Sequence, residues 1–189
     1  MEVGDVAAAL ARASGGDGEA FGLLVNTHAR TAFRLAYRLT GDERDAEDVV
    51  QESFIRAYRQ IGRFEARSNF GTWLHRIVVN CAMDTLRTRY ARRAERMGDP
   101  VDDVPDVPPS DDPSPERMAF SEEIRRQVDA SMTSLTPQER VAFALRHYEG
   151  RSIDEISRTL GVQKSAAKHA IFRAVRKLRA ALEPLRRMT

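Results

Sequence analysis

An all-helical fold is the class that this sequence predicts, and three observations support it. Ala, Leu, Arg and Glu dominate the composition, and all four occur readily in helices. Apolar residues recur every three or four positions over long stretches, which is the period of a helix with one buried face. Gly and Pro are concentrated in a few places, where they separate helices. With 189 residues, the chain has room for one or two domains.

Two amphipathic helices are expected after the Gly-rich break Ser14–Gly18, which follows a short, possible helix. The first ends at Gly41, and its apolar face consists of Phe21, Leu24, Val25, His28, Ala32, Leu35, Ala36 and Leu39. The second has an apolar face made of Ala46, Val49, Val50, Phe54, Ala57, Tyr58 and Ile61. Because His28 has no partner at metal-ligand spacing, we expect a core histidine with its hydrogen bonds satisfied.

The second helix begins with a high density of acid. Only one base, Arg44, accompanies the acidic residues of its first turns, which are Asp42, Glu43, Asp45, Glu47, Asp48 and Glu52. Acids at the start of a helix and bases at its end complement the helix dipole without any partner. The dipole does not explain the density, however, and an exposed acidic face also suits the docking of a basic surface on another protein.

The stretch Gly62–Arg87 begins as a loop and continues as a helix. Cations and aromatic rings are interleaved at its start, in the order Arg63, Phe64, Arg67, Phe70, Trp73 and Arg76. Cations bind the phosphates of single-stranded nucleic acid, and rings stack on its unpaired bases. The apolar positions also form an ordinary core stripe, made of Phe70, Trp73, Leu74, Ile77, Val78 and Cys81. The functional hypothesis therefore depends on the loop and on the polar positions Asn80 and Asp84.

Gly98–Glu116 is the predicted domain boundary. It holds six of the eight prolines and seven acidic residues without a base. Such a segment cannot bury enough apolar surface to fold, so we expect a flexible acidic, Pro-rich linker. We place two small helical domains at residues 19–97 and 117–189, with the linker at residues 98–116.

The second domain is expected to begin with a helix at about Arg117–Met132 and to continue with two capping boxes. Thr136–Glu139 starts one helix, and Ser152–Glu155 starts the next, which Gly161 ends. A long helix follows a three-residue turn, from about residue 164 to residue 182. Two helices joined by a short turn with Gly, in a basic context, predict a helix-turn-helix.

The last of these helices is strongly basic, because residues 163–187 carry a net charge of +7. We expect an inner stripe of Ala167, Ile171, Ala174 and Leu178. The outer face then presents Lys164, Ser165, Lys168, His169, Phe172 and Arg176, and a DNA major groove is the partner that fits it. We expect the residues near its N-terminal end to contact base edges. The residues expected to contact phosphates are Arg173, Arg176, Lys177 and Arg179.

Several other classes of protein are disfavoured. Cys81 is the only cysteine, which excludes a disulfide framework and a metal cluster of thiolates. Its position in an apolar stripe predicts a buried thiol. Four scattered histidines supply no nucleophile–base pair and no metal set, so we expect no enzyme, metal or cofactor. The acidic N-terminus lacks the pattern of a signal peptide, and no segment has the length of a membrane span. We expect a soluble, cytoplasmic protein.

The chain resembles the bacterial extracytoplasmic-function sigma factors, the compact class that has only regions 2 and 4. Asp45–Phe64 resembles the helix of regions 2.1 and 2.2, Ser68–Arg87 resembles regions 2.3 and 2.4, and Leu135–Arg179 resembles region 4. The likeness covers about residues 21–182. Many relatives carry Thr-Val-Lys-Ser-Arg early in the recognition helix, whereas this chain has Ala-Ala-Lys-His-Ala at residues 166–170. The upstream promoter sequence therefore does not follow from the resemblance.

The resemblance implies a role for each segment. The clamp helices of core RNA polymerase would bind Asp45, Glu47, Asp48, Gln51 and Glu52, and its flap would bind region 4. Promoter DNA would be melted at the −10 element, and a flipped base held, by Phe64, Ser68, Asn69, Phe70, Trp73, Arg76, Asn80 and Asp84. Region 4 would bind the −35 element through Lys164, Ser165, Lys168, His169, Phe172, Arg173 and Arg176. The linker would thread toward the RNA exit path, and an anti-sigma factor is a further implied partner.

Two other functions fit parts of the sequence. A sigma-like decoy that binds the polymerase or a regulator, and reads no promoter, does not need Trp73, Asn80 or a basic outer face. A conventional dimeric repressor needs a ligand or dimerisation domain, whereas this chain has only an acidic linker between its helical parts. We therefore expect a transcription initiation factor.

Overall fold

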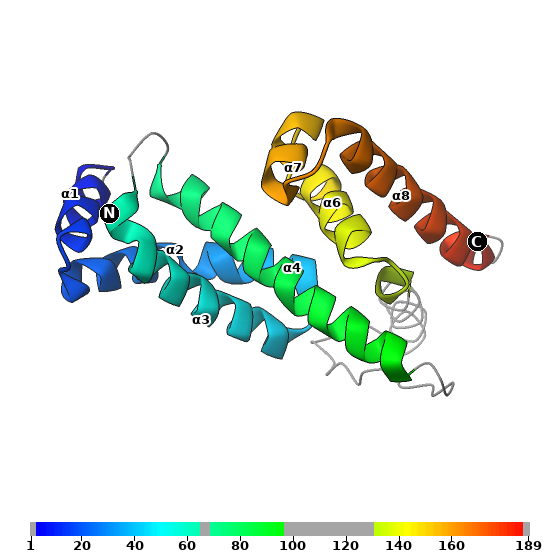
Figure 1. Cartoon of the computed structure of the whole chain (residues 1–189), viewed down its shortest axis with the longest axis horizontal. Coiled ribbons are helices and arrows are strands. Elements are labelled where there is room, and N and C mark those ends of the chain that lie inside the picture. The colour runs from blue at the N-terminus through cyan, green and yellow to red at the C-terminus, as the bar shows by residue number, and fades with distance from the viewer. Residues whose placement is uncertain (1–2, 65–68, 97–130, 187–189) are drawn as a thin grey trace, which may run out of the picture. The chain divides into compact units, whose positions relative to one another are not determined.

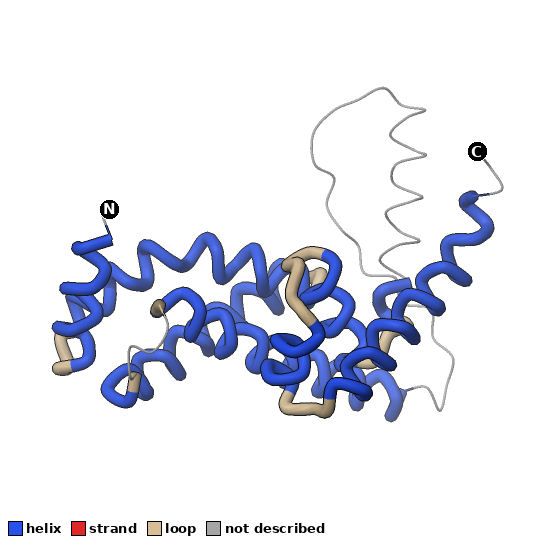
Figure 2. Tube along the Cα trace, turned by 90° about the horizontal axis from the view of Figure 1, so that it is seen from above, coloured by secondary structure: helices blue, strands red, loops and turns tan. Residues whose placement is uncertain are grey.

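The computed structural model describes residues 3–64, 69–96 and 131–186, and all regular elements in these ranges are helices (Figure 1, Figure 2). The first are α1 (Val3–Ser14), α2 (Gly18–Thr40), α3 (Glu43–Gln60), the 3-10 helix η1 (Ile61–Arg63) and α4 (Phe70–Arg96). They are followed by α6 (Pro137–His147), α7 (Ile153–Leu160) and α8 (Lys164–Arg186). The all-α prediction is confirmed. The predicted linker and nearly all of the predicted helix at residues 117–132 lie outside the described residues.

The chain divides into two compact units, Met1–Leu86 and Arg87–Thr189. In the first unit, capping determines where α2 and α3 begin. The Asp17 carboxylate accepts a hydrogen bond from the Ala20 N–H at 3.0 Å, and that of Asp42 accepts one from the Asp45 N–H at 2.9 Å. Gly41 ends α2 with φ 69°, a left-handed conformation that glycine adopts without strain.

The core of the first unit lies between α2, α3 and α4. Its most deeply buried large side chains include Leu24, Leu39, Val49, Val78 and Val79. Cys81 is buried, as predicted, and burial raises the pKa of its thiol. Tyr58 was predicted to lie on the apolar face of α3, and its burial there was not found. Its side chain is 47% exposed because it lies at the edge of that face.

His28 lies on the inner side of α2, against the start of α4. Its ring centroid is 5.2 Å from that of Phe70, and a Cβ at Gly71 would lie 3.3 Å from its Cε1. Burial lowers its pKa, and its Nε2 has no hydrogen-bond partner among the described residues. The expectation of satisfied hydrogen bonds was therefore wrong. Within the described ranges, no three His, Cys, Asp or Glu side chains are grouped to hold a metal ion.

The helix α1 packs on α2 and η1. Ala9 and Ala13 are buried, and the Ser14 hydroxyl donates a hydrogen bond to the carbonyl of Ile61 at 3.4 Å. The Gly-rich stretch after α1 forms a turn in which Arg12 pairs with Asp17 at 2.7 Å. The first unit thus includes a helix that the predicted boundary at residue 19 leaves out.

The second unit begins its helices as predicted, with one capping box at Thr136–Glu139 and another at Ser152–Glu155. Gly161 ends α7 with φ 64°, and α8 follows as the second helix of a helix-turn-helix. The buried stripe of α8 contains Ala170, whereas Ile171 is only half-buried. A core cluster made of Met132, Leu135, Ala174 and Leu178 packs against Phe143.

The helix α8 runs to Arg186, a little beyond its predicted end. None of the helices in the described ranges combines the length and the apolar content that crossing a bilayer requires.

Candidate nucleic-acid interface

Three aromatic rings meet where α4 begins. The ring centroids of Phe64 and Trp73 are 5.2 Å apart, and Phe70 lies 6.3 Å from Phe64 and 5.7 Å from Trp73. Phe64 and Trp73 are half-buried, whereas Phe70 is only 2% exposed. We therefore correct one expectation: Phe70 supports the other two rings from the core side and offers no open face to a base. The rings available for stacking are those of Phe64 and Trp73.

Asn69 holds the first turn of α4. Its side-chain Oδ1 accepts a hydrogen bond from the Thr72 N–H at 2.7 Å, and its carbonyl accepts one from the Trp73 N–H at 3.2 Å. A side-chain oxygen in this position stabilises a helix start, and the backbone carbonyl of Asn69 holds Trp73 in the same turn. Ser68, another predicted site residue, lies outside the described residues.

One exposed stripe of α4 brings the remaining predicted residues of this site together. Trp73, Arg76, Asn80 and Asp84 are spaced three or four residues apart, and the last three are exposed. A cation, an amide and a carboxylate thus follow the ring pair along one face, a donor and acceptor set that can bind a phosphate and the edge of a base.

Arg56 joins this stripe to α3. Its Nε lies 2.6 Å from a carboxylate oxygen of Glu52, and its Nη1 lies 3.1 Å from one of Asp84. These hydrogen bonds raise the pKa of Arg56, and the bond to Glu52 has the larger effect. Glu52 and Asp84 were predicted to belong to different sites, and the structure connects them through one guanidinium.

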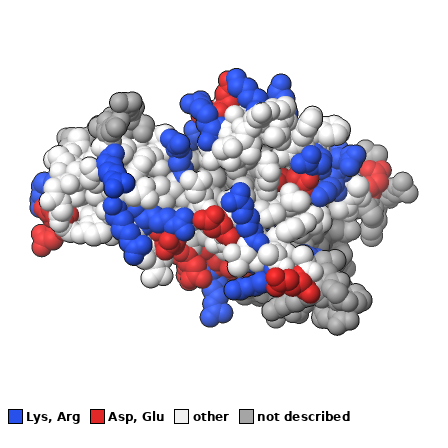
Figure 3. All heavy atoms as spheres, viewed as in Figure 1, with Lys and Arg blue, Asp and Glu red and all other residues white. Residues whose placement is uncertain are grey.

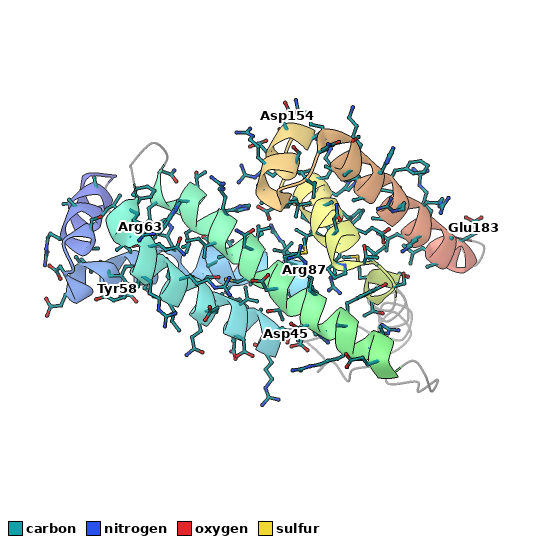
Figure 4. The ribbon with its side chains drawn as sticks, in the orientation of Figure 1. Asp45, Tyr58, Arg63, Arg87, Asp154 and Glu183 are labelled. Carbon is teal, nitrogen blue, oxygen red and sulfur yellow. The ribbon has the colours of Figure 1, made fainter. Side chains whose placement is uncertain are left out.

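Acidic side chains gather over α3 (Figure 3). Asp45 lies in its first turn and Tyr58 near its other end (Figure 4). Glu47, Asp48 and Gln51 are exposed, whereas Asp45 and Glu52 are half-buried. The predicted acidic face therefore exists.

A groove beside the acidic face was missed by sequence reasoning. It measures about 600 Å³ and is lined by Phe21, Val25, Gln51, Phe54, Ile55, Tyr58 and Arg59, from α2 and α3. Its wall includes Ile55, which is 39% exposed. An isoleucine outside the apolar stripe predicted for α3 was the available signal. An apolar groove next to acid fits a helix that has both apolar and basic side chains.

The outer face of α8 is basic and exposed. All six predicted outer residues are exposed: Lys164, Ser165, Lys168, His169, Phe172 and Arg176. Phe172 is 66% exposed, which is unusual for a large apolar side chain. Lys164 Nζ lies 2.8 Å from a carboxylate oxygen of Asp154 on α7, and Figure 4 labels Asp154 on that helix.

Arg173 does not lie on this open face alone, because a buried carboxylate holds it. Glu139, whose side chain is 3% exposed, accepts hydrogen bonds from Arg173 Nε at 2.8 Å and from Lys177 Nζ at 2.7 Å. It also accepts one from the Thr136 N–H at 3.0 Å. Burial acts to raise the pKa of Glu139, but the bonds from Lys177, Thr136 and Arg173 outweigh it and lower the pKa to about 2. The capping box predicted this glutamate, but not its burial.

Comparisons with known proteins agree with this geometry. Residues 24–96 match the family model for Sigma-70 region 2, and residues 125–178 match the model for Sigma-70 region 4. The chain is 36% identical to the RNA polymerase sigma-H factor of Pseudomonas aeruginosa, over 93% of each chain. It is 31% identical to the ECF RNA polymerase sigma factor SigW of Bacillus subtilis, over 90% of this chain and 92% of SigW.

A longer relative is the ECF RNA polymerase sigma factor SigE of Mycolicibacterium smegmatis. The identity is 38% over 82% of this chain, which spans only 59% of SigE.

Two solved structures share the fold. CnrH, in complex with the cytosolic domain of CnrY, aligns with a TM-score of 0.59 and 28% identity, over 93% of this chain and 96% of CnrH. The sigma factor RpoE of Bartonella quintana, in complex with the anti-sigma factor NepR, gives a TM-score of 0.58 at 22% identity, over 86% of this chain and 96% of RpoE. The chain belongs to the sigma-70 family, and within it to the extracytoplasmic-function sigma factors.

The depressed pKa of Glu139 predicts how stability changes with pH. A carboxylate whose pKa is lower in the folded state stabilises the fold above its ordinary pKa of about 4.5, and this contribution is lost as the pH falls toward about 2. We expect Glu139→Gln to be less stable than the wild type at pH 7, by on the order of 2 to 3 kcal/mol. The difference should shrink between pH 4.5 and pH 2. Urea unfolding followed by far-UV circular dichroism measures it, and a pH-independent difference would contradict the assignment.

Proposed function

We propose that this chain binds core RNA polymerase, directs it to specific promoters and helps to open the −10 element. The observation that supports this most strongly is the coincidence of two matches with two surfaces. The region 2 match covers the ring pair, the acidic face and most of the groove, and the region 4 match covers the helix-turn-helix. A decoy that reads no promoter has no need for either DNA-suited surface.

The first unit is proposed to hold the opened −10 element. A base that leaves the duplex loses a few kcal/mol of stacking and pairing. Stacking on an aromatic side chain returns about 1 to 3 kcal/mol per base, and Phe64 and Trp73 present the rings for it. Arg76 then binds a phosphate, while Asn80 and Asp84 contact the edge of the flipped base.

The acidic face and the groove of α3 are proposed to dock the clamp helices of the polymerase. Glu47, Asp48 and Gln51 are exposed for polar contacts, and Ile55 and Tyr58 line the adjoining apolar surface. Charge complementarity would orient the encounter, and burial of the groove would add most of the affinity.

The second unit is proposed to bind the −35 element with the outer face of α8 in the major groove. Lys164, Ser165, Lys168 and His169 lie in the first two turns of the helix, where recognition helices contact base edges. Phe172 can contact a thymine methyl group, Arg176 binds a phosphate, and the planar fork of Arg173 reaches a base edge. The boundaries proposed above, residues 19–97 and 117–189 with a linker between them, enclose both family matches.

A protein regulator is also proposed. CnrH has been solved with the cytosolic domain of CnrY, so a related chain of this fold binds a second protein. By extension an anti-sigma factor would bind this chain in the cytoplasm, where the polymerase works. The chain itself would contribute binding alone, and the polymerase would carry out the synthesis.

The first test is in vitro transcription with purified core polymerase. We expect initiation at specific sites of a genomic template when this chain is added, and none of those starts with core polymerase alone. Start sites are mapped by sequencing the 5′ ends of the transcripts. A chain that binds the polymerase but yields no specific start would be a decoy.

A second test separates the two DNA-binding units. Lys168→Ala should weaken binding of the holoenzyme to closed promoter duplex about tenfold, because a contact to a base or phosphate is worth about 1 to 3 kcal/mol. Trp73→Ala should leave closed-duplex binding unchanged and slow strand opening, measured by permanganate reactivity of unpaired thymines. Loss of the same step in both variants would refute this division of labour.

A third test concerns the groove. Ile55→Glu places a charge on its apolar wall and should weaken binding to core polymerase at least tenfold, because burying an aliphatic side chain contributes about 1.5 kcal/mol or more. Leu23→Glu is the matched control, since Leu23 is similarly exposed, at 45%, but does not line the groove. Fluorescence anisotropy of labelled protein titrated with core polymerase gives both affinities. Equal affinities for the two variants would place the dock elsewhere.

A further inference from the structure

We infer that Glu139 is a positioning residue for DNA reading: from the first turn of α6 it holds the guanidinium of Arg173 in one orientation toward the DNA. The inference rests on the proposed function, because it takes α8 to be the helix that enters the major groove. It adds a residue that does not itself touch DNA.

The carboxylate of Glu139 has no freedom to turn. One oxygen accepts from Arg173 Nε at 2.8 Å, and the other accepts from Lys177 Nζ at 2.7 Å and from the Thr136 N–H at 3.0 Å. The side chain is 3% exposed, so water cannot readily replace a lost partner. Rotation would leave a buried charge with fewer hydrogen bonds, which is costly.

Arg173 lies at the border between the inside and the outside of α8. Its neighbours in sequence are Phe172, which is 66% exposed, and Ala174, which is fully buried, and its own side chain is 48% exposed. The guanidinium is a rigid planar fork. With its Nε bound to Glu139, the guanidinium is restrained, and its two Nη groups remain for an acceptor on DNA.

Capping alone does not account for this arrangement. Glu155 performs the same capping role at the start of α7, accepting from the Ser152 N–H at 2.9 Å, and it pairs with Arg151 on the surface. A negative charge beside a DNA-binding helix also repels phosphates, so Glu139 weakens the general attraction to DNA. Glu139 differs from Glu155 in its contact with α8, and that contact restrains Arg173.

The test compares Glu139→Gln with Glu155→Gln in the full chain bound to core polymerase. The probes are a duplex that the wild-type holoenzyme selects from a pool with a randomised upstream element, and a scrambled duplex of equal length. At one salt concentration, Glu139→Gln should lower the ratio of selected to scrambled affinity about tenfold, a loss typical of one base contact, since a lost phosphate contact would weaken both duplexes alike. Its affinity for the scrambled duplex should stay equal or rise, because a negative charge is removed. Glu155→Gln should keep the wild-type ratio.

Two further variants show whether Glu139 acts through Arg173. Arg173→Lys keeps the charge but lacks the fork, so it should lower the ratio as Glu139→Gln does, and the double variant should lose no more than either single one. Glu139→Asp keeps the charge, and its backbone N–H can still bond to the Thr136 hydroxyl, but its carboxylate is too short to reach Arg173. It too should lower the ratio, so this variant serves as the test if Glu139→Gln fails to fold.

Three results would overturn the inference. An unchanged ratio in folded Glu139→Gln, or an equal loss in Glu155→Gln, would mean that Glu139 stabilises the fold but does not position Arg173 for DNA. Additive losses in the double variant would separate it from Arg173. A wild-type holoenzyme that selects no duplex from the pool would refute the proposed function itself.

Discussion

Three hydrogen bonds converge on the carboxylate of Glu139, and the arrangement of the second unit depends on them. A buried carboxylate is stable only when its partners replace the water that it has lost. Here the partners are the backbone N–H of Thr136 and the side chains of Arg173 and Lys177. Two of these partners belong to α8 and one to the start of α6. The same two carboxylate oxygens therefore cap the start of α6 and hold α8 against it. Apolar contacts around Ala174 and Leu178 add affinity between the helices but little directional preference.

The first unit uses a comparable device nearer to the surface. Arg56 is shared by Glu52 on α3 and Asp84 on α4; Glu52 is proposed for polymerase docking and Asp84 for the flipped base. Exposed ion pairs are weak, so this pair of contacts can be exchanged for contacts with a partner at small cost. The surface proposed to bind the polymerase and the surface proposed to bind the opened strand are thus adjacent parts of one charged network.

Helix order, capping boxes, the left-handed glycine after α7 and the basic outer face of α8 were predictable, because each depends on local sequence rules. Contacts between helices were not predictable, because periodicity indicates which face of a helix is buried but not which residues of another helix pack against that face. Phe70 fits both a stacking platform and a core stripe, and only packing against His28 and Trp73 assigns it to the core. The groove at Ile55 arises from two helices together. Likewise, Glu139 matched a capping motif, and nothing near it in sequence indicates Arg173.

The anchoring contacts of α8 and its DNA-facing side chains occupy different sides of the helix. Ala167, Ala170 and Ala174 are fully buried, whereas Lys164, Lys168 and Phe172 point outward. Substitutions on the outward side leave the packing undisturbed, so target preference can drift during evolution with hardly any penalty in folding. Two chains built on this scaffold can therefore share one fold and still differ in the DNA that they select.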